Sequence, residues 1–180
     1  MPLDRDALLR AAADFLGRRP NATTDEIAAA VGVSRATLHR HFTGKPALME
    51  AVDELAIAEM RNAVKTARLD RDSATEALRR LITAFQRVSP YLALLYSQSQ
   101  EIDADKSMDG WAAIDTAIAD LFTRGQRAGE FRQDLTATWL TEALYGLVAG
   151  AGWCIQVGRV AGRDFDFVIT ELLLHGVSTS

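Results

Sequence analysis

Residues 23–42 read TTDEIAAAVGVSRATLHRHF, and this stretch decides the fold. Thr23 stands three residues before Glu26, which is the spacing of a capping box at the start of a helix. Gly32 supplies the positive φ that a tight turn between two helices requires. Ser34 can cap the helix that follows this turn. The stretch therefore predicts a helix-turn-helix, whose second helix enters the major groove of DNA by its N-terminal end.

The second helix of this pair, predicted over residues 35–42, has an apolar and a polar face. Leu38 and Phe42 are four residues apart, so both point inward. A small residue and a hydroxyl on the other face allow close approach to base edges. An arginine there can donate two hydrogen bonds to guanine or reach a phosphate. The outward positions are Ala36, Thr37 and Arg40.

A long fourth helix is predicted from about Lys45 to Leu69, with Pro46 in its first turn. The charge of Lys45 and the exposed N–H groups at the helix start could hold one phosphate together. This helix is expected to link the DNA-binding head, formed by the helices before it, to the body of the protein.

Apolar residues recur at helical spacing along nearly the whole chain, and no stretch alternates in the manner of a half-buried strand. The chain is therefore predicted to be all-α, with about nine helices, and the helices beyond the head should pack as one bundle. The remaining helices are predicted at about 4–18, 73–88, 90–100, 107–128, 135–157 and 164–177.

Three segments of the head resemble a known family: TTDEIA from Thr23, GVSRATLHRHF from Gly32 and GKPAL from Gly44. Over residues 4 to about 52 the chain resembles the TetR family, which implies a DNA-binding transcriptional regulator. His39 stands where this family usually has tyrosine. The positions that match DNA-contacting residues of the family are Thr24, Ser34, Arg35, Ala36, Thr37, His39, His41 and Lys45, and the helical wheel adds Arg40.

Charge is distributed unevenly along the chain, whose formal net charge is -4. Residues 1–50 hold seven Lys or Arg and six Asp or Glu, a net charge of +1, whereas residues 51–180 have a net charge of -5. Only the head is therefore suited to meet phosphate. We expect residues 1–48 to form the helix-turn-helix domain and residues 49–180 to form a helical domain for ligand sensing and dimerisation.

Aromatic residues of the body have two possible roles. A bundle of this size needs several of them to fill its core. The family resemblance implies instead that some line a mostly apolar cavity for a small apolar or amphipathic molecule. The candidate pocket residues are Phe85, Tyr91, Tyr96, Trp111, Phe122, Tyr145 and Trp153.

The last two predicted helices have surfaces suited to a partner, because one is unusually thin and the other is broadly apolar. The family resemblance implies that these two helices pack against the same two helices of a second copy across a two-fold axis. The result is a homodimer with a four-helix interface. The operator should then be a near-palindrome. The candidate interface residues are Gly146, Ala149, Gly150, Phe167, Val168 and Leu172.

The location of the protein is expected to be cytoplasmic. Cys154 is the only cysteine, so no disulfide can form within the chain, and its apolar neighbours suggest a buried thiol in a reducing compartment. The chain does not open with a basic and then apolar leader. The longest nearly apolar run, residues 143–155, is shorter than the ~20 residues that a membrane-spanning helix needs, so no membrane partner is expected.

These features favour a repressor that binds operator DNA as a dimer and is released by a small molecule. A DNA-binding regulator without a small-molecule ligand is the main alternative. An enzyme is the less favoured alternative, because the sequence has no phosphate-cradling glycine loop, no metal-ligand cluster and no nucleophile with a paired base. We therefore expect no catalytic residues, no metal site and no cofactor.

Overall fold

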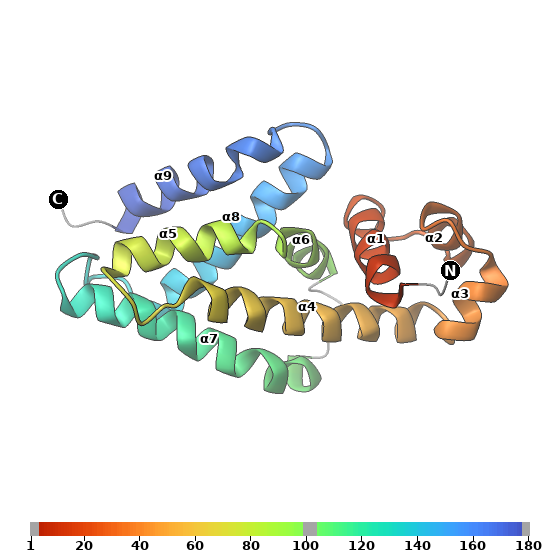
Figure 1. Ribbon diagram of the computed structural model, residues 1–180, viewed down its shortest axis with the longest axis horizontal. Helices are drawn as coiled ribbons and strands as arrows, with labels where there is room; N and C mark the ends of the chain where they lie inside the picture. The colour runs from red at the N-terminus through yellow and green to blue at the C-terminus, as the bar shows by residue number, and fades with distance from the viewer. Residues whose placement is uncertain (1–3, 99–103, 178–180) are drawn as a thin grey trace.

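The protein is all-α, and its computed structural model describes residues 4–98 and 104–177. Three short helices form a head, and the long α4 joins this head to a helical bundle (Figure 1). The predicted fold is therefore confirmed. Within the described ranges the helices are α1 Arg5–Arg18, α2 Thr24–Ala30, α3 Arg35–His41, α4 Lys45–Ala67, α5 Ala74–Phe85, α6 Ser89–Gln98, α7 Ala104–Arg127, α8 Ala137–Gln156 and α9 Phe165–Val177.

Short-range hydrogen bonds fix the ends of the head helices. The Thr23 backbone N–H donates to Glu26 Oε2 over 2.8 Å, and the Glu26 N–H donates to Thr23 Oγ1 over 3.3 Å, which completes the predicted capping box. Gly32 has φ +76°, the left-handed conformation that the turn after α2 needs. Ile27 and Leu38 are buried, so the two helices of the motif share one small core.

Helix α4 runs from the head into the body, where it lies beside α5 and α7 (Figure 1). Leu48 near its start and Met60 farther along are both buried, so this one helix packs in the head core and in the bundle core. At its C-terminal end, Arg80 donates to the Ala67 and Arg68 carbonyls over 2.8 and 3.1 Å. The predicted boundary between residues 48 and 49 lies inside α4 and stays a prediction.

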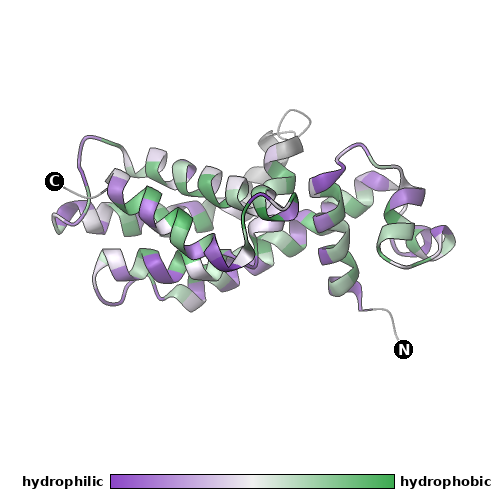
Figure 2. Ribbon diagram, turned by 90° about the horizontal axis from the view of Figure 1, so that it is seen from above, coloured by the Kyte–Doolittle hydropathy of each residue, from purple (hydrophilic) through white to green (hydrophobic). Residues whose placement is uncertain are grey.

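Close backbone approach holds the bundle together where α6 crosses α8. A Cβ atom at Gly152 would lie 2.8 Å from the Ser89 carbonyl oxygen, so only glycine fits at this position without moving a helix. Hydrophobic residues, green in Figure 2, run along the helices of the bundle. None of the helices in the described part of the chain is long and apolar enough to cross a membrane.

Helix ends differ slightly from the predicted ranges because local caps determine them. Helix α8 begins at Ala137, two residues later than predicted, since the Thr136 hydroxyl accepts the Trp139 N–H over 3.1 Å. Helix α5 ends at Phe85 rather than near residue 88. A short 3₁₀ turn, Gly162–Asp164, precedes α9, where one continuous helix from residue 164 was expected.

The turn after α7 supplies a cap for α5. Glu130 accepts the Ala74 N–H over 3.0 Å and the Thr75 N–H over 2.8 Å. Burial raises the pKa of Glu130, but these hydrogen bonds and the nearby Arg124 outweigh it and leave the pKa below its ordinary value. The ionised carboxylate of Glu130 therefore stabilises the folded protein.

Replacing Glu130 with glutamine should lower the free energy of unfolding by about 1–2 kcal/mol at neutral pH, because a charged acceptor is lost. A lowered pKa makes the carboxylate's contribution complete above its unfolded-state pKa and absent below its folded-state pKa. The difference between wild type and Glu130→Gln in urea unfolding should therefore shrink from about pH 7 to about pH 3. Glu76→Gln, at an exposed site on α5, is the control; an equal loss there would contradict the capping role.

Candidate functional site

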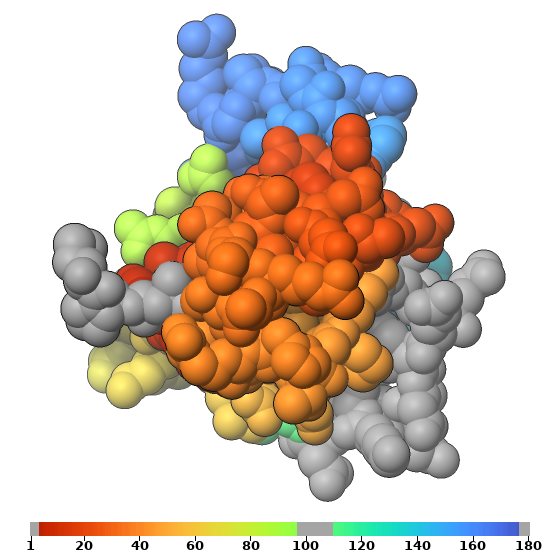
Figure 3. Space-filling view, turned by 90° about the vertical axis from the view of Figure 1, so that its right-hand side faces the viewer, coloured from red at the N-terminus to blue at the C-terminus, as the bar shows by residue number. Residues whose placement is uncertain are grey.

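The polar face of α3 lies on the surface at the head end. Leu38 is only 1% exposed and anchors the helix to the core of the head. Figure 3 shows the residues around α3, in orange, at the centre of the face seen from this end. The residues of the predicted contact set that are exposed are Ser34, Arg35, Ala36, His39, Arg40 and His41, and those that are half-buried are Thr24, Thr37 and Lys45.

Two hydroxyls at the start of α3 hold each other in place. The Thr37 N–H donates to Ser34 Oγ over 3.0 Å, and the hydroxyl oxygens of Ser34 and Thr37 lie 2.9 Å apart. Ser34 therefore caps the helix, as predicted from the sequence. Thr24 begins α2, next to the Thr23 cap.

The basic residues of the head have different partners. Arg35 pairs with Asp25 of α2 over 2.9 Å, although both side chains are exposed. The Lys45 ammonium donates to the Pro20 carbonyl over 2.6 Å, which ties the start of α4 to the loop after α1. In the part of the chain that the structure describes, Arg40 has no ion pair. Arg40 is therefore the cation of the predicted set that is most available to DNA.

The N-terminus of α4 is open. Gly44 precedes it with φ +100°, and no side chain caps its first N–H groups. Such N–H groups carry the positive end of the helix dipole and commonly bind phosphate. The prediction that Lys45 and this helix end hold one phosphate is thus compatible with the geometry, with Lys45 retaining two further protons to donate.

Four of the predicted pocket residues, Phe85, Tyr96, Trp111 and Tyr145, come together in the body, with Tyr96 45% exposed at its surface. The ring of Tyr145 on α8 stacks on the Phe85 ring, with centroids 6.4 Å apart. It also packs against the Trp111 ring in a T-shaped arrangement, with centroids 6.4 Å apart. The Tyr145 hydroxyl donates to Asp115 of α7 over 2.8 Å. We call this group, with the neighbours Glu142 and Asp53, the acid–aromatic cluster.

Burial and nearby carboxyl groups together shift the pKa values of the acid–aromatic cluster. Burial raises the pKa of Tyr96, and Glu142 and then Asp115 raise it further. Burial also raises the pKa of Asp53 against a hydrogen bond from Trp111, and its Oδ1 atom is buried with no hydrogen-bond partner in the described structure. Carboxyl groups of Asp53, Asp115 and Glu142 therefore lie beside the aromatic rings.

The other predicted pocket residues lie elsewhere. Tyr91 is buried near Arg10 and Glu59 at the junction with α1, where burial and then Glu59 raise its pKa to about 12. Phe122 packs against Phe131, with ring centroids 5.8 Å apart. Trp153 is 39% exposed and lies under the Arg159 guanidinium at 4.7 Å, so it faces the surface.

The outer surfaces of α8 and α9 expose large apolar side chains. Phe167 and Leu172 of α9 are 67% and 62% exposed. A Cβ atom added at Gly146 or Gly150 of α8 would meet no neighbouring atom within 4 Å, which leaves that helix thin on its outer side. Of the other predicted interface residues, Val168 is half-buried, and Ala149 is 4% exposed because it faces the interior of the bundle. Further apolar residues exposed on α8 and at its end are Trp139, Trp153 and Val157.

Comparison with known proteins agrees with this arrangement. Residues 8–52 match the family described as bacterial regulatory proteins, tetR family. The HTH-type transcriptional regulator NfxB of Pseudomonas aeruginosa is 31% identical over 175 residues, which cover 96% of this chain and 94% of NfxB. The chain belongs to the TetR family. It is therefore a DNA-binding transcriptional regulator.

Other TetR proteins match along the whole length as well. The HTH-type transcriptional repressor LfrR of Mycolicibacterium smegmatis is 27% identical over 173 residues, covering 93% of this chain and 87% of LfrR. The crystal structure of LfrR in complex with proflavine matches 98% of this chain and 97% of that chain, with a TM-score of 0.77 and 22% identity. A TetR-family regulator from Agrobacterium tumefaciens matches with a TM-score of 0.72 and 19% identity, covering 97% of each chain.

Sequence reasoning missed the carboxylates that this TetR-family chain places beside its aromatic residues. Asp115 stands four residues after Trp111, and Glu142 stands three residues before Tyr145. Both spacings bring side chains to one face of a helix, so a search for acidic residues at these distances would have found two of the three. Asp53 lies on α4, and no local spacing connects it to the others.

Proposed function

We propose that this protein is a ligand-responsive repressor that binds a near-palindromic operator as a homodimer in the cytoplasm. The observation that carries the proposal is the exposed polar face of α3, held by buried Leu38 and capped by Ser34. In this proposal, Arg40 reads base edges in the major groove. Lys45 and the open start of α4 hold a phosphate.

The proposed dimer uses the outer faces of α8 and α9. Exposed side chains as large as Phe167 and Leu172 of α9 and Trp139 of the neighbouring α8 are typical of an association surface. The same patch on a second copy gives a closed two-fold dimer, which presents two α3 helices to two half-sites. The thin outer side of α8 at Gly146 and Gly150 supports close approach of the partner.

The proposed ligand is a lipophilic aromatic cation bound at the acid–aromatic cluster. Aromatic rings attract cations through their faces, and Asp53, Asp115 and Glu142 add negative charge. The structure of the relative LfrR holds proflavine, an aromatic cation, which supports the same ligand class here. The alternative interpretation of the sequence is a DNA-binding regulator without a small-molecule ligand. In that case these carboxylates would have no cation to bind.

Operator binding by two variants tests the DNA-binding proposal, with operators recovered by selecting genomic fragments that the purified protein retains. Arg40→Ala should lose ~1–3 kcal/mol of discrimination between operator and altered sequences, since it removes a base contact. Lys45→Gln keeps a donor for the Pro20 carbonyl but removes the charge. It should weaken binding to all sequences alike and lower the salt slope by about one unit.

The control for both variants is Arg127→Ala, which removes an exposed arginine from the end of α7, far from the head. Thermal unfolding of all three variants checks that the fold is intact. Unchanged operator affinity in Arg40→Ala and Lys45→Gln, measured at the same salt concentration, would exclude this face of the head as the DNA-binding surface.

A further inference from the structure

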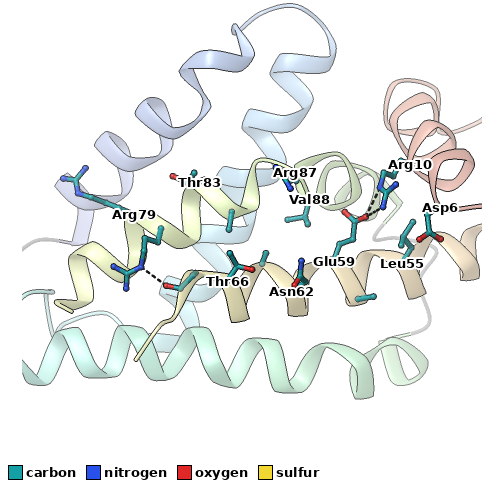
Figure 4. A pocket seen from close by; sticks show the side chains of 15 residues that line it. Asp6, Arg10, Leu55, Glu59, Asn62, Thr66, Arg79, Thr83, Arg87 and Val88 are labelled. Atoms are coloured by element: carbon teal, nitrogen blue, oxygen red, sulfur yellow. Dashed lines mark hydrogen bonds and ion pairs between the residues drawn. The ribbon is translucent and has the colours of Figure 1, made fainter. Parts of the chain in front are cut away.

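A groove of about 1110 Å³ lies between α4 and α5, and α1 reaches one end of it (Figure 4). None of the predicted pocket residues lines this groove, and neither do the acidic residues of the acid–aromatic cluster. The groove is therefore separate from the proposed ligand site in the body.

The floor of the groove is apolar and made of small side chains. Ala63, Ala67 and Val88 are buried at 7%, 1% and 1% exposure, and Ala84 is half-buried beside them. Alanine at three of these four positions gives the bottom of the groove small side chains. From Leu55 to Ala67, the lined part of α4 is about 18 Å long, so the groove is elongated.

One wall of the groove is cationic. Arg79 and Thr83 stand four residues apart on α5, and Arg87 follows in the turn just after this helix; all three line the groove (Figure 4). The α4 wall opposite carries the neutral polar residues Asn62 and Thr66.

Three of the other charged side chains of the groove, Arg10, Glu59 and Arg80, already have partners, while Asp6 at the α1 end has no ion pair within the described residues. Arg10 pairs with Glu59 over 2.8 Å at the α1 end. Arg80 donates to carbonyls at the end of α4 and pairs with Asp72 over 2.9 Å. By contrast, Arg79 lies 3.9 Å from Glu76, and Arg87 has no ion pair within the described residues.

We propose that this groove binds an amphipathic anion, with an acyl chain along the alanine floor and a carboxylate or sulfate group held by Arg79 and Arg87. Guanidinium groups bind such oxyanions through paired hydrogen bonds, and the apolar floor removes the chain from water. Because α1 belongs to the head while α5 belongs to the body, the bound anion contacts both.

Calorimetric titration with dodecanoate below its micelle concentration tests the proposal. Wild-type protein should bind dodecanoate with one-to-one stoichiometry and with an affinity that falls as salt rises, since the contact is ionic. The double variant Arg79→Gln/Arg87→Gln should bind at least tenfold more weakly. Ala58→Trp fills the groove from its exposed α4 rim and should abolish binding.

Two controls separate this site from the others. Arg127→Gln removes an arginine outside the groove and should leave dodecanoate binding unchanged. Dodecyltrimethylammonium, with the same chain and the opposite charge, should not displace dodecanoate. All variants should bind operator DNA as wild type does without dodecanoate, so this proposal and the DNA-binding proposal can fail independently. Absence of dodecanoate binding, equal binding by the double variant, or displacement by the cation would overturn the anion site.

Discussion

Glutamate in place of Phe167 and Leu172 should convert the protein from a dimer to a monomer. Each exposed apolar side chain that the interface buries contributes about 1.5–3 kcal/mol per protomer. Losing one such side chain from both protomers therefore costs about 3–6 kcal/mol per dimer, which raises the dimer dissociation constant more than a hundredfold. Two substitutions per chain also bring four like charges to the two-fold axis, which adds repulsion.

Sedimentation at micromolar concentration measures this change directly, and operator titration measures its consequence. A monomer presents one α3 helix and loses the second half-site, so operator affinity should fall by a similar or larger factor. Ala112→Glu, at an exposed site on α7, is the control because it adds a carboxylate to a helix outside the proposed interface. A double variant that still sediments as a dimer would show that the protein associates through another surface.

The head could be predicted from the sequence because its signals act over a few residues. The capping box links Thr23 with Glu26, and the Ser34 side chain accepts the Thr37 N–H. Gly32 alone provides the positive φ of the turn. Each contact forms within one helical turn or at one backbone position, so residue type and spacing were sufficient. Their combination also carried the family resemblance, which the comparisons then confirmed.

The body could be predicted as a helical bundle, but its site could not, because the site depends on packing between distant segments. Tyr145 and Asp115 meet although they are 30 residues apart in sequence. Neighbouring residues of α8 also point to different sides, so Ala149 is buried while Gly150 is exposed. The direction of each side chain follows from the rotation of α8 in the bundle, which composition does not specify.

An aromatic cation in the body should weaken operator binding by a factor of about 5 to 150, the usual range of coupling between two sites. The structure offers two rigid connections for this coupling. Helix α4 is continuous from Lys45 in the head to Asp53 in the acid–aromatic cluster and beyond. A Cβ atom at Gly17 of α1 would lie 2.8 Å from the Gln156 side chain of α8, so the head also packs closely on the body.

Tetraphenylphosphonium is a suitable cation for this experiment, because flat cations such as proflavine also intercalate into DNA. Asp115→Asn should weaken its binding, since the variant removes a carboxylate that contacts Tyr145. Asp120→Asn, at an exposed site on the same helix, should not change it. The neutral triphenylphosphine oxide should bind more weakly than the cation to wild-type protein. Equal binding of both compounds would contradict the assignment of a cationic ligand.

The most direct test of a ligand-responsive regulator is a pair of titrations with tetraphenylphosphonium, followed by tryptophan fluorescence, without and with saturating operator DNA. All three tryptophans, Trp111, Trp139 and Trp153, lie in the body. Linkage requires the operator to weaken cation binding by the same factor by which the cation weakens operator binding. Matching factors of at least fivefold are the expected result. A cation that binds in the body with the same affinity in both titrations would contradict ligand control of DNA binding.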